Sequence, residues 1–252
     1  SVNISRGKHI LLTDGQRITT ETREMLVSLF HGTSEYTAVL TPSATEALNI
    51  IIQGQEWIEG QNIYISPFEH NAVIRTIKYL EQKKGINVFE LSVDRESLQF
   101  SFDRIRKQFS ENKPAMVIVT HISNVCGNIN PIEKLGVVAK EFGATYVVDC
   151  AQSAGLLTTD IIKAKADYMV FAGHKTLYGP FGCSGFVCKK NVNLNPLIYG
   201  GIGIDSLNWD MPSEVPQRFE AGSYNILSIA GLYAALKWNQ QIGINNIFDK
   251  EK

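Results

Sequence analysis

The sequence of 252 residues is poor in cysteine, in net charge and in long apolar runs. Its four cysteines are Cys126, Cys150, Cys183 and Cys188. They are too few and too scattered for the disulfide framework of a small secreted domain. They form no C-x-x-C pair, which gives a structural zinc site little support. The 24 basic and 25 acidic residues nearly cancel, so no attraction to nucleic acid is expected. No apolar run suits a membrane span, and the first residues are not signal-like. We therefore expect a cytoplasmic protein whose partner is a small molecule.

Short β-branched runs alternate with amphipathic helical stretches along the chain. This pattern is typical of an α/β domain with a mainly parallel, seven-stranded sheet and helices on both faces. Strands are predicted over residues 37–40, 62–66, 87–91, 116–120, 145–148, 168–171 and 185–188. Helices are predicted over residues 19–30, 43–53, 70–83, 132–142 and 226–242.

Polar side chains follow directly after five consecutive predicted strands. Ligands of open α/β sheets bind outside the carboxyl ends of the strands, so these residues are the candidates for a site. They are Ser43 and Thr45, His70, His121 with Asn124, Asp149 with Gln152, and His174 with Lys175.

The helix starts among these candidates have both a structural and a functional interpretation. Ser43 and Glu46 form a capping-box pattern, and the free N–H groups of such a helix start can also bind phosphate. His70 could cap the helix that follows it, stack on a planar ligand, or act as an acid or base. Taken alone, both positions favour the cap.

Asp149 and Lys175 each follow an apolar strand. The carboxylate of Asp149 is expected to be partly buried, and its partner could be a metal, a histidine, a protonated ring nitrogen or the cation of a salt bridge. Lys175 could form a Schiff base with an aldehyde, or could be a surface lysine of a loop. His121 is left open between structure and function. A metal-dependent hydrolase using His121 and Asp149 lacks a third ligand at a recognised spacing, so no metal is expected.

Several motifs together decide among these interpretations. They are residues 41–49 (TPSATEALN), 69–72 (EHNA), 120–127 (THISNVCG), 148–155 (VDCAQSAG), 173–175 (GHK) with 179–182 (GPFG), and 218–223 (RFEAGS). In this order and spacing, the sequence resembles the class V aminotransferase family, and within it the cysteine desulfurases and selenocysteine lyases. The resemblance implies a fold-type I enzyme that uses pyridoxal 5'-phosphate (PLP).

The resemblance implies a role for each residue around the cofactor ring. Lys175 would hold PLP as a Schiff base and then shuttle a proton, and Asp149 would pair with the protonated pyridine nitrogen. His70 would stack on the ring and serve catalysis with Lys175. Gln152 would hydrogen-bond the phenolic oxygen, and Asn124 would lie near the same edge.

The resemblance also implies a phosphate site shared by two subunits. The N–H groups of Ala44 and Thr45, the Thr45 hydroxyl and His174 would hold the phosphate. Ser223 would reach the phosphate of the neighbouring subunit, which implies a homodimer. The family has serine where Ala172 stands, so one phosphate hydroxyl is missing here.

Residues 1–252 correspond in this comparison to the large PLP-binding domain. The family's N-terminal segment and its small C-terminal domain are expected to be absent from this chain. That domain supplies the arginine for the substrate carboxylate and, in desulfurases, the cysteine that accepts sulfur. Cys126 and Cys150 lie next to strand ends and are interpreted as small buried residues rather than reactive thiols.

The function expected from the resemblance is removal of sulfur or selenium from cysteine-type amino acids to give alanine, with a sulfur-acceptor protein as partner. The ring-binding residues would serve other PLP reactions equally well, so a class V aminotransferase or another PLP-dependent reaction on a small amino acid is the first alternative. The second is a truncated, inactive fragment that binds PLP or only dimerises.

Overall fold

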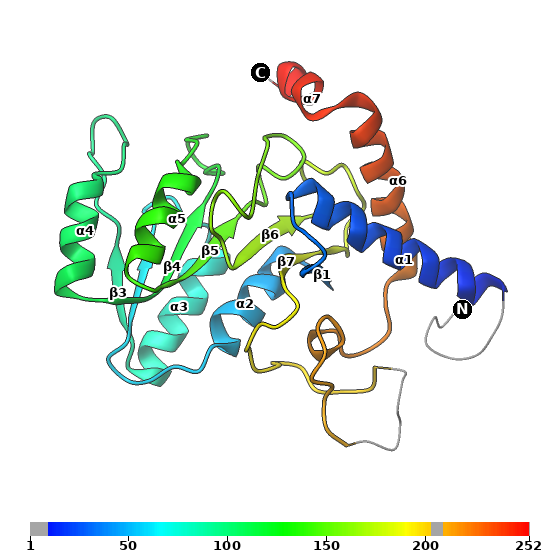
Figure 1. Ribbon diagram of the computed structural model, residues 1–252, viewed down its shortest axis with the longest axis horizontal. Coiled ribbons are helices and arrows are strands. Elements are labelled where there is room, and N and C mark those ends of the chain that lie inside the picture. Colours follow the sequence, from blue (N-terminus) through cyan, green and yellow to red (C-terminus); the bar gives the residue numbers. More distant parts are fainter. Residues whose placement is uncertain (1–9, 203–208, 252) are drawn as a thin grey trace.

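A seven-stranded sheet lies at the centre of the molecule (Figure 1). The computed structural model describes residues 10–202 and 209–251, so residues 1–9, 203–208 and 252 of the predicted domain lie outside the described residues. The strands are β1 (Tyr36–Thr41), β2 (Asn62–Ile65), β3 (Asn87–Glu90), β4 (Pro114–Thr120), β5 (Thr145–Asp149), β6 (Tyr168–Ala172) and β7 (Ser184–Lys189). Each predicted strand is confirmed with small shifts at its ends.

The strands are arranged in the order β1-β7-β6-β5-β4-β2-β3. Neighbours from β3 to β6 are parallel, whereas β7 is antiparallel to both β6 and β1. The prediction of a mainly parallel α/β sheet is therefore confirmed. Because β6 and β7 are antiparallel neighbours, a loop rather than a crossover helix joins them.

Helices cover both faces of the sheet, as predicted. They are α1 (Ile10–Leu29), α2 (Ala44–Gly54), α3 (Asn71–Lys84), α4 (Phe102–Glu111), α5 (Ile132–Glu141), α6 (Ile226–Ile242) and α7 (Ile244–Glu251), with a 3₁₀ turn at Gln217–Phe219. The prediction missed α4, α7 and the first half of α1. In α4 only Ile105 and Phe109 are buried, and in α7 only Ile247, so neither helix has an apolar stripe long enough to be recognised.

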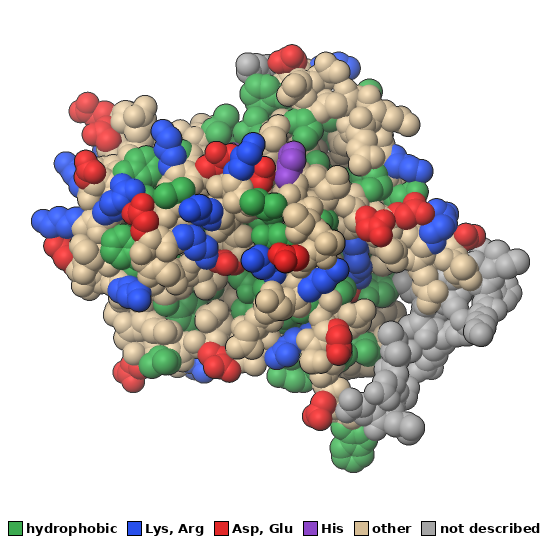
Figure 2. Space-filling view, in the orientation of Figure 1, with side chains coloured by type: hydrophobic (Ala, Val, Ile, Leu, Met, Phe, Trp, Pro, Cys, Tyr) green, Lys and Arg blue, Asp and Glu red, His purple; other side chains and the backbone are tan. Residues whose placement is uncertain are grey.

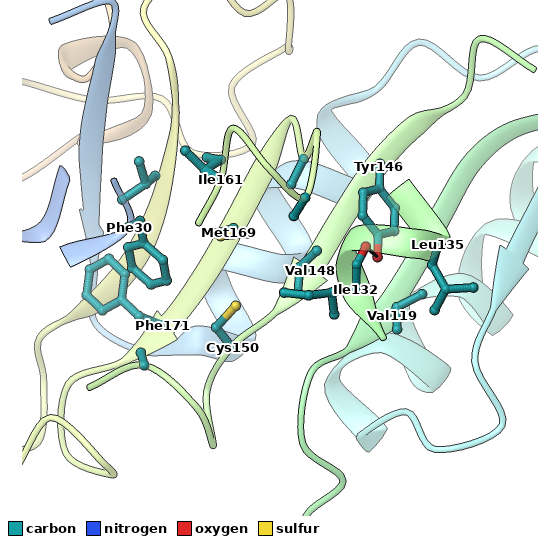
Figure 3. Packing of buried hydrophobic residues seen from close by; sticks show 14 of the residues in the cluster. Phe30, Val119, Ile132, Leu135, Tyr146, Val148, Cys150, Ile161, Met169 and Phe171 are labelled. Carbon is teal, nitrogen blue, oxygen red and sulfur yellow. Dashed lines mark hydrogen bonds between the residues drawn. The ribbon is translucent and has the colours of Figure 1, made fainter. Parts of the chain in front are cut away.

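Two apolar cores lie on opposite faces of the sheet because successive strand side chains point in opposite directions. In β5, Tyr146 and Val148 join the core under α1, α4, α5 and α6, whereas Val147 joins the core under α2 and α3. Figure 3 shows the first core, in which Phe30 of the segment after α1 lies beside Phe171 of β6 with ring centroids 6.4 Å apart. These cores fix the strand ends on which the site is built.

The surface carries charges of both signs. On the face seen in Figure 2, basic and acidic side chains are interspersed, consistent with the formal net charge of -1. None of the helices in the part of the chain that the structure describes is long and apolar enough to cross a membrane.

Candidate functional site

The predicted site residues follow the carboxyl ends of parallel strands. These ends lie side by side at one end of the sheet, which is called here the carboxyl edge of the sheet. Asp149 is the last residue of β5, and His70 follows β2. Asn124 follows β4, and Lys175 follows β6. Since β2, β4, β5 and β6 are neighbours in the sheet, their ends bring these segments to one place.

Asp149 is a buried acidic residue at the carboxyl edge of the sheet. Only 3% of the residue is exposed, and its Oδ1 accepts a hydrogen bond of 2.9 Å from the N–H of Ala151. Burial raises the pKa of Asp149, while the Ala151 amide and the charges of Lys175 and His70 oppose this rise. The structure thus brings Lys175 and His70 each within electrostatic reach of Asp149.

His70 is the N-cap of α3, and the capping hydrogen bond holds its ring. Its Nδ1 accepts a hydrogen bond of 3.1 Å from the N–H of Ala72, so the structural interpretation of His70 as a helix cap is confirmed. His70 and Thr45 also line a surface cavity of about 430 Å³. A ring fixed in this way can still present its face to a ligand.

The turn that carries His174 and Lys175 is fixed by a close approach of two backbone segments. A Cβ atom on Gly173 would lie 2.1 Å from the carbonyl oxygen of Cys183, so only glycine allows the turn to pack against the start of β7. The backbone N–H of Lys175 donates to the carbonyl of Ala172 at 3.2 Å. Both side chains are partly exposed, and the ring of His174 stacks on Phe181 with centroids 4.5 Å apart.

The N-terminus of α2 supplies free backbone donors. The Ser43 hydroxyl accepts from the N–H of Glu46 at 3.1 Å, which confirms the predicted cap. The first N–H groups of a helix have no partner within it, so those of Ala44 and Thr45 remain available. Helix dipole and free donors together suit an anion.

Three other predicted site residues make no contact that would test their predicted roles. Asn124 is exposed in the turn after β4, and Gln152 is partly exposed after β5. Ser223 lines a second cavity, of about 220 Å³, together with Thr41 and Tyr224. Within the described residues, no hydrogen bond joins these three to the other predicted site residues. The predicted roles of Asn124, Gln152 and Ser223 stay predictions.

The polar groups at this end of the sheet fit a planar cofactor with an anionic group and a protonated ring nitrogen. The buried carboxylate of Asp149 matches a cationic nitrogen, and the α2 N-terminus matches an anion. The Nδ1 of His174 is buried without a hydrogen-bond partner among the described residues, so it is free for a further polar group. No three His, Cys, Asp or Glu side chains within residues 10–202 and 209–251 group as a metal site would require.

His121 is buried and hydrogen-bonded within the protein. It is 6% exposed, and its Nδ1 lies 2.9 Å from the hydroxyl of Ser153. Its backbone N–H donates to the carbonyl of Asp149 at 2.9 Å, which ties the ends of β4 and β5 together. Burial lowers the pKa of His121 to about 4.

Acid is therefore expected to destabilise the protein through His121. Its pKa is about 4 in the folded chain and roughly 6.5 when unfolded, so the unfolded state binds a proton first as the pH falls. The contribution is intact above about pH 6.5 and is lost toward pH 4, by roughly 3 kcal/mol. Urea unfolding at both ends of this range should show a smaller acid loss for His121→Gln than for the wild type. An equal loss in both proteins would refute this assignment.

The cysteine prediction holds for Cys150 but is wrong for Cys126. Cys150 is fully buried, whereas Cys126 is exposed, because it lies in the turn between Ile122 and Ile129 rather than on the strand. A hydrogen bond with the side chain of Ser123 lowers the pKa of the Cys126 thiol.

Two buried carboxylates near the site were missed from the sequence. Glu69, next to His70, accepts a hydrogen bond of 2.6 Å from the N–H of Thr120. Glu220 accepts two from the guanidinium of Arg23, at 2.7 and 2.6 Å, and one of 2.6 Å from the N–H of Leu40. The sequence shows that Glu69 follows a strand and that Glu220 lies in the RFEAGS motif. It does not show that either side chain is buried, because no local sequence pattern marks a buried acidic residue.

The fold and the site define a class-V aminotransferase: the family model matches residues 1–252, and the chain belongs to this family. It is 34% identical over 256 residues to a probable cysteine desulfurase of Pyrococcus abyssi, covering 99% of this chain and 63% of the relative. A probable cysteine desulfurase of Methanothermobacter thermautotrophicus is 31% identical, with 98% and 62% covered.

Solved structures agree with this assignment. An apo cysteine desulfurase from Thermococcus onnurineus superposes with a TM-score of 0.90 at 29% identity, over 99% of this chain and 63% of that one. The cysteine desulfurase CsdA from Escherichia coli gives a TM-score of 0.83 at 25% identity, over 96% and 61%. The chain thus spans somewhat less than two thirds of the length of these relatives.

Proposed function

We propose that this chain is the cofactor-binding part of a PLP-dependent cysteine desulfurase, which removes sulfur from cysteine, or selenium from selenocysteine, and leaves alanine. The observation that carries the proposal is the meeting of Asp149, Lys175 and His70 at one sheet edge. The relatives named cysteine desulfurases support the choice of reaction. A further relative, 26% identical, is described as SspA in complex with cysteine.

In this proposal the chain's own residues hold the cofactor from three sides. Asp149 holds a proton on the pyridine nitrogen, and that cation offsets the burial that raises the pKa of the carboxyl. His70 packs on the ring face, in the orientation that its cap to Ala72 imposes. The N–H groups of Ala44 and Thr45 bind the phosphate, with His174 as a further donor.

When bound, PLP supplies an electron sink for negative charge that develops at the substrate α-carbon. Lys175 would hold the cofactor through its amine, and the same amine would take and return a proton at the substrate α-carbon. Asn124 and Gln152 bind the edge of the ring that carries the phenolic oxygen.

The partners belong to the same proposal. Ser223 is exposed beside the start of α6, where it can reach the phosphate of a second copy of the chain in a homodimer. A sulfur-acceptor protein would take the sulfur. A cytoplasmic location is supported by the four free cysteines, which suit a reducing compartment.

The proposed reaction predicts which products form. Supplied with PLP, cysteine and an excess of a dithiol reductant, the protein is expected to form alanine and sulfide in equal amounts. Cleavage of the carbon–sulfur bond leaves the amino group on alanine and sulfur at the zero oxidation level, and the dithiol reduces that sulfur to sulfide as it becomes a disulfide. Sulfide assay and amino-acid analysis measure both, and L-serine is the matched control that lacks sulfur. A keto acid formed in place of sulfide would instead identify a transaminase, and neither product with PLP bound would identify an inactive fragment.

A further inference from the structure

The carboxyl group of Glu69 joins the ends of two strands. After β2 the chain turns at Pro67, and Oε1 of Glu69 accepts the N–H of Thr120 at the end of β4 at 2.6 Å. The hydroxyl of Ser66 donates to the same oxygen. Glu69 therefore ties the segment that leads into α3 to the neighbouring strand.

This tie acts on His70, the next residue. The backbone before His70 is held through Glu69, and the ring is held through the hydrogen bond of 3.1 Å from Ala72 to Nδ1. A histidine fixed on both sides keeps one ring orientation at the mouth of the cavity that it shares with Thr45. Loss of the tie would leave the cap but free the segment before it.

The surroundings of Oε2 of Glu69 indicate whether the carboxyl group is neutral or ionised. Glu69 is partly exposed as a residue, but its Oε2 is buried and has no hydrogen-bond partner among the described residues. An ionised carboxylate with one oxygen buried and unpaired costs far more than a neutral acid in the same place. Both contacts to Oε1 come from donors, which leaves Oε2 as the oxygen that carries the proton.

We propose that Glu69 is a positioning residue of the cofactor site that acts as a neutral carboxylic acid: it fixes His70 while leaving Asp149 as the carboxylate charge of this sheet edge. The inference rests on the proposed function for the identity of the cofactor. The charge state of Glu69 does not depend on it.

The surroundings of Glu69 favour its neutral form. Burial raises the pKa of Glu69 to about 8, and the charge of Asp149 adds to this, while the bonds from Ser66 and Thr120 oppose it. The other titratable group of β5 that interacts with it is Tyr146, whose pKa burial raises well above its usual value, so it stays neutral.

Other titratable groups lie at this end of the sheet within the described residues. Two of them, the buried thiol of Cys150, whose pKa burial raises, and the ring of His174, whose pKa burial lowers, favour their neutral forms. The others are His121 after β4, which burial keeps neutral above a pKa of about 4, His70 next to Glu69, and Lys175, whose charge acts on Asp149. The charges of Lys175 and His70 lower the pKa of Asp149 and so favour its ionised form. A second negative charge on Glu69 would disfavour that form.

Stability of the cofactor-free protein tests the charge state. A carboxyl whose pKa is about 8 when folded and roughly 4.3 when unfolded stabilises the folded chain at low pH and loses that effect as the pH rises to 8. From about pH 5 to pH 8.5, the unfolding constant of the wild type should rise at least about 100-fold relative to that of Glu69→Gln. A constant ratio, or one that falls, would overturn the proposal.

PLP binding tests the positioning role. At about pH 6.5, Glu69→Gln should bind PLP within about threefold of the wild type, whereas Glu69→Ala should bind at least about tenfold more weakly. Raising the pH to about 9.5 should weaken the wild type about tenfold more than Glu69→Gln, because two carboxylates then interact. Absorbance of the bound cofactor measures both.

The outcomes separate the two proposals. Equal PLP affinity of Glu69→Ala and Glu69→Gln at matched stability, or a pH response shared by Glu69→Gln and the wild type, would overturn the role of Glu69 alone. A wild-type protein that binds no PLP at any pH would overturn the proposed function and the positioning role with it. The stability measurement would still decide the charge state.

Discussion

Replacing Lys175 by alanine is expected to abolish covalent attachment of PLP and to lower the turnover of cysteine by about 100- to 10,000-fold. Lys175 is the amine that the β6–β7 turn brings within electrostatic reach of Asp149, and a positioned proton donor and acceptor contributes an effect of this size. Borohydride reduction followed by peptide mass analysis measures attachment. Alanine formation from cysteine measures turnover.

Two further variants make the Lys175 result specific. Lys175→Arg keeps a positive charge near Asp149 but cannot form the bond to PLP, so it should also lack the reducible product. Lys163→Ala removes an exposed lysine that lies 3.8 Å from Asp160, and it should behave as the wild type. Retention of the reducible PLP bond in Lys175→Ala would assign the attachment to another lysine.

Replacing Glu220 by alanine is expected to lower the free energy of unfolding by about 3 to 5 kcal/mol. The side chains of Arg23 and Glu220 are 13% and 2% exposed, so the substitution leaves a buried guanidinium without its carboxylate. It also removes the acceptor of the N–H of Leu40 and of the Tyr224 hydroxyl, both at 2.6 Å. Urea unfolding monitored by circular dichroism measures the loss.

A second arginine–glutamate pair provides the control. Arg106 donates to both oxygens of Glu141, at 2.8 and 3.0 Å, but the two side chains are 43% and 41% exposed. Exposed pairs of this kind contribute little, so Glu141→Ala should change stability only slightly. If Glu220→Ala costs no more than Glu141→Ala, burial of the Arg23–Glu220 pair has no energetic consequence.

The strands and the main helices were predictable because their signals are local. Val147 and Val148 belong to a β-branched run, and Ser43 with Glu46 marks a helix start whatever the rest of the chain does. The same local reasoning places Asp149 and Lys175 at strand ends. It also overestimates the burial of Cys126, since a residue just beyond a strand can turn outward.

The order of the strands and the buried acids depend on contacts between distant segments. The pairing of β1 with β7 joins residues from opposite parts of the chain, and nothing in either strand alone specifies it. Glu69 and Glu220 look like ordinary charged residues until Thr120 and Arg23 approach them in the folded chain. Such pairs are fixed by tertiary packing.

The antiparallel strand β7 also governs when the protein can fold during synthesis. β1 pairs with β7 alone, and α2 with its N-terminal donors follows β1 directly. β1 therefore cannot pair within the sheet until β7 has left the ribosome, whereas α2 also packs against α3 and β6. A nascent chain stopped before β7 would expose the unpaired edges of both β1 and β6, and such edges pair readily with other chains. β1, the first strand to be translated, therefore waits for the last strand before it can pair.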